Sequence, residues 1–196
     1  MKRNFTKILS LLLMLTVLCS LVFAMSITAN AASSDTIYIN NIAIKEGQHL
    51  MANATAVTTT KPSSDYAYYK DGTLTLNNYT YDGAGCSVPR YSDYTALVYS
   101  EKALTVKLVG TNTLTNSIDS YGVGIWVENE ALTIIDGGSG ALNMTVKDDG
   151  IFADDDDINI QGGAITVTAE DDGIYSEYNL TISGGKVTVT AEDCGI

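Results

Sequence analysis

Pairs of acidic residues recur just before a Gly-Ile step, at a spacing that could gather carboxylates into one place. The acids are Asp148, Asp149, Asp171, Asp172 and Asp193, and Cys194 stands where a sixth acid would complete the third pair. If these segments stack as parallel strands, equivalent residues lie about 4.8 Å apart, and like charges that close repel each other. Calcium binds several carboxylate oxygens in flexible geometry and would remove the repulsion. The pattern therefore predicts that these five aspartates are calcium ligands.

The same acids have a simpler explanation as solvated corners between strands. Aspartate favours turns, and charged residues at strand ends block unwanted strand pairing. A further acidic run, Asp154 to Asp157, occupies the next corner, near Glu177 of the following repeat. Both the calcium site and the solvated corner remain open from the sequence.

An aromatic residue follows each Gly-Ile step, at Trp126, Phe152 and Tyr175. If the isoleucines point into the core, these three side chains point outward and stack on one another. An exposed aromatic stripe is a surface on which the CH faces of sugar rings can pack. The three residues are therefore candidate carbohydrate-binding residues, with a purely stabilising role in the strands as the alternative.

These residues need strands that repeat in register, and the sequence repeats with a period that converges on 22 residues. The glycines of the Gly-Ile step are Gly124, Gly150, Gly173 and Gly195, and a second register of apolar residues is Leu104, Leu132, Ile158 and Leu180. Each unit contains three short runs of alternating apolar and polar residues, as in 158–160, 164–169 and 173–176. One unit cannot bury its own apolar face, whereas stacked units can.

The predicted fold class is therefore all-β, a right-handed parallel β-helix, or solenoid, with coils of about 22 residues. Three strands separated by unequal corners resemble the right-handed class more than the left-handed class with its shorter coils. A β-sandwich is the alternative architecture, although it does not account for a converging period. The chain ends within the third strand of a unit, so we expect further coils to be missing at the C-terminus.

The chain divides into three predicted parts. Residues 1–31 begin with basic residues, continue with a long apolar run and end in Ala29-Asn30-Ala31, which is typical of a secretory signal peptide. An uncleaved membrane anchor is the alternative and would be the only membrane attachment. Residues 32–95 are less regular and are predicted to form an N-terminal cap and the first coils. Residues 96–196 are predicted to form the regular coils.

The composition argues against several classes of protein. The net charge is −12, and removal of residues 1–31, which contain three basic and no acidic residues, makes it −15. Such a surface repels phosphate backbones, so no nucleic-acid partner is expected. His49 is the only histidine, which excludes multi-histidine metal sites and most histidine-based triads. Cys86 and Cys194 show no metal-site spacing and indicate no disulfide framework.

Two segments resemble a known group of proteins. They are ALTIIDGGSGALNMTVKDDGIFADD and GGAITVTAEDDGIYSEYNLTISGGKVTVTAEDCGI, and the resemblance covers roughly residues 96–196. They resemble secreted bacterial surface proteins with carbohydrate-binding parallel β-helix domains, of a type that contains calcium and binds cellulose and acidic sugars. The resemblance implies that the Asp-Asp-Gly corners hold calcium. Asp193 matches this pattern, whereas Cys194 departs from it and weakens the last site.

The sequence thus predicts an extracellular, secreted polysaccharide-binding protein of the cell surface, assisted by calcium and without enzymatic activity. One alternative is a structural adhesin or stalk whose coils act as a spacer. The other is a polysaccharide lyase or glycoside hydrolase, because two carboxylates suffice for glycoside hydrolysis. Nothing in the sequence marks one pair of acids as catalytic.

Overall fold

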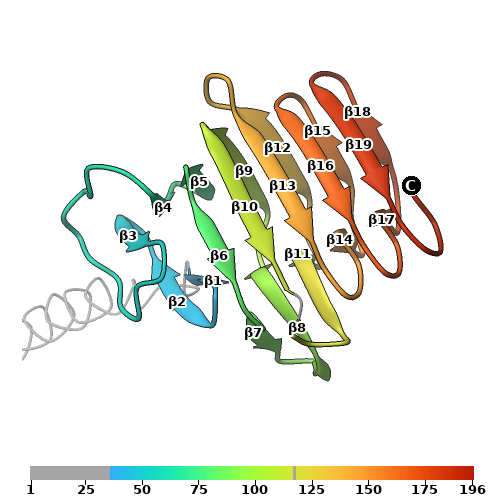
Figure 1. Ribbon diagram of the computed structural model, residues 1–196, viewed down its shortest axis with the longest axis horizontal. Coiled ribbons are helices and arrows are strands. Elements are labelled where there is room, and N and C mark those ends of the chain that lie inside the picture. Colours follow the sequence, from blue (N-terminus) through green and yellow to red (C-terminus); the bar gives the residue numbers. More distant parts are fainter. Residues whose placement is uncertain (1–35, 117) are drawn as a thin grey trace, which may run out of the picture. The chain divides into compact units, whose positions relative to one another are not determined.

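The computed structural model describes residues 36–116 and 118–196, which form strands arranged in three sheets (Figure 1). Sheet A contains, in spatial order, β17 (Ile174–Ser176), β14 (Ile151–Asp154), β11 (Gly122–Glu128), β8 (Tyr91–Ser100), β1 (Thr36–Ile39) and β2 (Ile42–Lys45), with β7 (Cys86–Val88) also paired to β8. None of the described segments forms a helix of the length and hydropathy that crossing a bilayer requires.

The other two sheets have the same succession of strands. Sheet B contains β18 (Leu180–Ile182), β15 (Ile158–Ile160), β12 (Leu132–Asp136), β9 (Leu104–Val109), β5 (Thr73–Asn77), β4 (Tyr66–Lys70) and β3 (Gln48–Met51). Sheet C contains β19 (Lys186–Thr190), β16 (Ala164–Thr168), β13 (Ala141–Thr145), β10 (Thr111–Thr115) and β6 (Thr80–Asp82).

From β8 onward the chain visits the three sheets in turn, so each sheet receives every third strand. The strands that become neighbours in this way are parallel, and they lie in successive rows from green to red in Figure 1. The all-β prediction is confirmed, and parallel sheets disfavour a sandwich of antiparallel sheets. The right-handed parallel β-helix stays a prediction.

The pairing follows both registers expected from the sequence. In sheet A, Ile125 pairs with Ile151 and Ile151 pairs with Ile174. In sheet B, the second register pairs in order through residues 104, 132, 158 and 180. The hydrogen bond from the Cys194 amide to Asp172 joins residues 22 positions apart, which is the predicted coil length.

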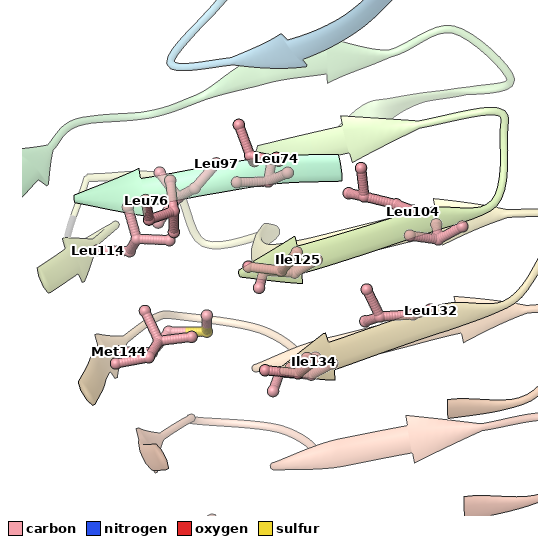
Figure 2. Packing of buried hydrophobic residues seen from close by; sticks show 14 of the residues in the cluster. Leu74, Leu76, Leu97, Leu104, Leu114, Ile125, Leu132, Ile134 and Met144 are labelled. Carbon is pink, nitrogen blue, oxygen red and sulfur yellow. The ribbon is translucent and has the colours of Figure 1, made fainter. Parts of the chain in front are cut away.

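One hydrophobic core lies between the three sheets. Figure 2 shows leucine, isoleucine and methionine side chains from all three sheets, including Leu97 of β8, Leu104 of β9 and Leu114 of β10. These side chains are almost fully buried. The alternation of apolar and polar residues therefore places one face of each strand in a shared interior, which explains the stacking of units that could not fold alone.

The glycine of the Gly-Ile step is required by close packing between coils. A Cβ added to Gly150 would collide with Cγ1 of Val167 and with the carbonyl oxygen of Gly173, the next glycine in the same column. The amide of Gly173 in turn donates to the carbonyl of Cys194. The repeated glycine thus allows the coils to approach at this corner, beside the acidic pairs.

The strands before residue 95 are mostly antiparallel. The pairs β1–β2, β3–β4 and β4–β5 are antiparallel, and β1 closes one end of the parallel strands by pairing with β8. Parallel pairing nevertheless starts early, because β5 pairs with β9 and β6 with β10. The predicted signal peptide, residues 1–31, lies outside the described residues.

Candidate functional site

The three predicted sugar-binding aromatic residues lie in one column on the outer face of sheet A. Trp126 pairs with Phe152, and Phe152 pairs with Tyr175, on β11, β14 and β17. Their ring centroids are 4.9 Å and 5.4 Å apart along the column. Tyr99 of β8 occupies the equivalent position in the preceding strand. The structure therefore brings the three residues together, although their role in binding stays a prediction.

The column is not uniformly exposed, because the strand pair β7–β8 covers one end of it. Tyr91 stacks on Trp126 with ring centroids 5.3 Å apart, and Tyr94 meets the same indole edge-on at 5.8 Å. Trp126 is consequently only 3% exposed, whereas Tyr175 is 42% exposed. Trp126 thus contributes a buried wall and Tyr175 an open surface, which differs from the continuous exposed stripe expected from the sequence.

A cavity of about 250 Å³ lies where this cover meets the aromatic column. We call it the aromatic cavity, and its lining residues are Tyr91, Tyr94, Val123, Trp126, Asp149, Phe152, Asp154 and Glu177. Four of these residues are aromatic and three are acidic. Concave sites with aromatic walls and a few polar groups are the usual form of small-molecule sites.

A row of acidic residues runs beside the aromatic column, and we call it the acidic row: Glu101, Glu128, Asp154 and Glu177. Each member follows an aromatic residue of the column by two positions, and within the strands this step keeps Glu128 and Asp154 on the same face as Trp126 and Phe152. Glu128 pairs in register with Asp154, and a carboxylate oxygen of Asp154 lies within 4.8 Å of one from Glu177. Sheet A therefore presents rings and carboxylates side by side.

In the first half of the acidic row both glutamates are hydrogen-bonded, and Glu128 is also paired with a positive charge. Glu128 is 3% exposed, accepts a hydrogen bond from the Tyr99 hydroxyl and forms an ion pair with Arg90 at 2.9 Å. The Tyr99 hydroxyl also lies 3.2 Å from Glu101. Burial and these two carboxylates raise the pKa of Tyr99 well above its usual value. Tyr99 therefore remains a hydrogen-bond donor at neutral pH.

The second half of the acidic row lacks such partners. Asp154 is only 8% exposed, and among the described residues its carboxylate makes no hydrogen bond or ion pair. Burial is the largest cause that raises the pKa of Asp154, followed by the charge of Glu177. Because this partly desolvated carboxylate has no hydrogen-bond donor among the described residues, the Asp154 side of the aromatic cavity is suited to a ligand that donates hydrogen bonds or carries positive charge.

The five predicted calcium ligands fall into two groups. Asp148, Asp149 and Asp171 offer oxygens that all lie within 4.8 Å of one another, and Asp172 and Asp193 form a second such group with Cys194. The second group is more exposed than the first. The spacing of the acidic pairs therefore did predict gathered carboxylates, while calcium binding stays a prediction.

The first of these groups has the features of a cation site. Burial and the neighbouring aspartates raise the pKa of Asp148 to about 6 and that of Asp149 to about 7. Oδ2 of Asp148 is buried and has no hydrogen-bond partner. Carboxylates that repel each other in a partly buried corner are stabilised by a hard cation, so these residues fit calcium.

Two of the corner aspartates also hold neighbouring coils together. Oδ1 of Asp149 accepts the amide of Asp172 at 3.1 Å, and Oδ1 of Asp172 accepts the amide of Cys194 at 2.9 Å. This ladder is the structural role that the solvated-corner explanation requires. Asp148 takes no part in it, which makes Asp148 the residue that best separates the two explanations.

Sequence reasoning missed Tyr91, Tyr94, Glu101 and Glu128. The two glutamates were detectable, because Glu101 follows Tyr99, and Glu128 follows Trp126, by the two-residue step that keeps side chains on one face. The two tyrosines carry no such signal. Their place over Trp126 depends on the antiparallel pairing of β7 with β8, which has a register shift at Ser87 and Val88.

Comparison with known proteins gives a similarity to a protein family. Residues 127–196 match the model of a family described as carbohydrate-binding domain-containing protein. No match was found among curated proteins or among solved structures. The matched segment contains Phe152, Tyr175 and the acidic corners. The similarity supports a carbohydrate-binding role for this chain, with a carbohydrate as its partner.

Proposed function

We propose that this chain is a secreted, non-catalytic protein of the cell surface that binds polysaccharide at the aromatic cavity. The observation that carries the proposal is the cavity itself, with four aromatic residues and three acidic residues around about 250 Å³. The similarity of residues 127–196 to a carbohydrate-binding family supports the same function. The apolar run and small residues at 1–31 support secretion.

The chemistry of the cavity suits a sugar. The CH groups of a sugar ring pack against aromatic faces, while its hydroxyls require hydrogen-bond partners at the rim. Phe152 and Tyr175 offer the rings that remain accessible, and Asp149 and Asp154 offer acceptors. The volume lies near the lower end of small-molecule sites, which are roughly 300–1,000 Å³. We therefore expect one sugar unit in the cavity and its neighbours along the open end of the column.

The architecture that we propose is a right-handed parallel β-helix with coils of about 22 residues. The succession of strands through sheets A, B and C supports a coil of three strands. Such a coil repeats its outer face at each turn, so aromatic and acidic residues form rows. A repeating polymer is the kind of ligand that such rows can follow.

Calcium is the proposed cofactor, with Asp148, Asp149 and Asp171 as its ligands and Asp172 and Asp193 as a weaker second set. The buried, unpaired Oδ2 of Asp148 supports the first set. Asp149 belongs to the first set and also lines the aromatic cavity. Calcium bound to this set would therefore reduce the negative charge at one side of the cavity. Calcium would then assist binding without being required for the aromatic contacts.

The test is retention of the purified chain on insoluble polysaccharides, with cellulose and cross-linked polygalacturonate as supports, with calcium and with a chelator. The double variant Phe152→Ala/Tyr175→Ala should lose most of the retention, because it removes the accessible rings. Tyr178→Ala is the matched control, since Tyr178 is 67% exposed and does not line the cavity. Retention that is unchanged in the double variant would place binding elsewhere.

The same preparations distinguish the alternatives. A chain that is retained by no polysaccharide would be better explained as a surface spacer. Release of reducing ends or of unsaturated products from the supports would show a hydrolase or a lyase. We expect retention and no release of products.

A further inference from the structure

The aromatic cavity contains more negative charge than a neutral sugar needs. Its lining includes Asp149, Asp154 and Glu177, and no lysine or arginine is among the described lining residues. The nearby Arg90 is paired with Glu128 of the acidic row. Arg90 also attracts Asp154, but it is a single positive charge shared with Glu128, so the three carboxylates of the lining keep an excess of negative charge that a ligand can offset.

Asp154 is the residue that defines this requirement. It is more than nine-tenths buried, lines the cavity and has no hydrogen bond or ion pair among the described residues. Asp149, on the other side of the cavity, already accepts the amide of Asp172. The vacant acceptor is thus on the Asp154 side, beside Glu177, and it is separate from the proposed calcium ligands Asp148 and Asp171.

The aromatic walls favour positive charge as well. The faces of tryptophan, tyrosine and phenylalanine attract a cation that lies within about 6 Å of the ring centroid, and the attraction is stronger in a desolvated site. Tyr91, Trp126 and Phe152 line the same space as Asp154, so aromatic rings and carboxylates border it together. Rings and carboxylates therefore select the same kind of ligand.

We propose that the aromatic cavity binds sugar units that carry a free amino group, as in a polysaccharide of deacetylated amino sugars. The ammonium group donates to Asp154 and Glu177 while the ring of the sugar packs on Phe152. This inference rests on the proposed function, because it names the class of polysaccharide that the same cavity takes.

Other sugars satisfy the cavity less well. A neutral sugar offers hydroxyl donors to Asp154 but leaves its charge uncompensated. An N-acetylated sugar replaces the ammonium with an amide and adds bulk in a small cavity. A uronic acid places a carboxylate beside Asp154 and Glu177, where like charges repel. The order expected for affinity is therefore amino sugar first, neutral and N-acetylated sugars next, and uronic acid last.

The experiment is a calorimetric titration of the purified chain with four oligosaccharides of equal length, at about pH 6 and in the presence of a chelator. They are the tetramers of glucosamine, N-acetylglucosamine, glucose and galacturonic acid, and short oligolysine is the control for any polycation. We expect the glucosamine tetramer to bind about tenfold or more tightly than the neutral tetramers, as a charge-assisted hydrogen bond implies.

Asp154→Asn keeps the shape of the side chain and one acceptor oxygen but removes its charge, so it should weaken binding of the glucosamine tetramer about tenfold and weaken binding of the glucose tetramer clearly less. Asp71→Asn is the matched control, because it removes the same charge from an exposed residue that does not line the cavity. It should leave both affinities unchanged. Thermal unfolding of each variant confirms that the fold is intact.

Three results would overturn the inference. Equal affinity for the glucosamine and glucose tetramers would refute it while leaving polysaccharide binding intact. Oligolysine that binds as tightly as the glucosamine tetramer would show a general polycation surface. An equal loss of affinity for the glucosamine tetramer in Asp154→Asn and Asp71→Asn would show that binding depends only on the long-range attraction of the net negative charge. If none of the four sugars binds, the proposed function fails together with the inference.

Discussion

Asp148 provides the sharpest test of the acidic corner, through the variant Asp148→Asn. The residue is 7% exposed, its carboxylate lies beside those of Asp149 and Asp171, and its Oδ2 has no hydrogen-bond partner. Asparagine has the same shape without the charge, and its amide can donate to the neighbouring carboxylates. In a chelator at about pH 8, we therefore expect the variant to be more stable than the natural chain.

The magnitude follows from the pKa. The pKa of Asp148 is raised to about 6 from its ordinary value of 3.8, by burial first and then by the charge of Asp171. Each pKa unit corresponds to about 1.36 kcal/mol, so the charged form of this side chain costs the folded state at most about 3 kcal/mol. Solvent around the corner reduces this cost, and we expect a gain of about 1–3 kcal/mol, or roughly 3–10 °C in Tm.

The sign of the pH dependence is fixed by the same shift. Because the pKa values of Asp148 and Asp149 are raised on folding, the folded chain holds protons that the unfolded chain releases between about pH 4 and pH 7. The stability of the natural chain in a chelator should therefore fall as the pH rises through this window. In Asp148→Asn the fall should be smaller.

The assay is thermal unfolding from pH 5 to pH 8, in a chelator and in calcium, with Asp82→Asn as the control at an exposed acid. If calcium binds as proposed, it raises the Tm of the natural chain at pH 8 and raises that of Asp148→Asn much less. A variant that is less stable than the natural chain in chelator at pH 8 would refute the reasoning, because the charged carboxylate would then be stabilising.

The remaining predictions concern packing and thiol chemistry. Gly150→Ala should destabilise the chain by about 1–3 kcal/mol in urea unfolding, because its Cβ would collide with a neighbouring coil. Gly195→Ala is the control and should be neutral, since no atom lies within 4 Å of a Cβ added there. Equal effects of the two variants would contradict the packing argument. Burial raises the pKa of Cys86 to about 11, so in a chain that starts at residue 32 a thiol reagent at pH 8 should modify only the exposed Cys194 before unfolding. Reaction of both thiols in the folded chain would show that Cys86 is accessible.

The repeat allowed the all-β class and the strand register to be predicted from sequence. Alternation in segments such as Ala164–Thr168 identifies the buried face, and two independent registers fix which residues become neighbours. The structure has both registers, as in the pairing of Ile151 with Ile174. Repetition supports this prediction, because each repeat unit is separate evidence for the same strand pairing. The strands before residue 95 do not repeat, so their antiparallel pairing gave no comparable signal.

In the candidate site, too, the residues of the repeat could be predicted from sequence and the residues outside it could not. Residues that belong to the repeat, namely Trp126, Phe152 and the acidic pairs, could be placed by period alone, and the two-residue step also yields Glu128. The exposure of Trp126 could not be predicted, because it depends on Tyr91, which lies at the start of β8, where that strand pairs with β7 and not yet with β11. That non-repeating cover converts an open row of rings into a cavity beside Asp154. Selectivity for one kind of sugar would therefore arise where the irregular part of the chain meets the regular coils.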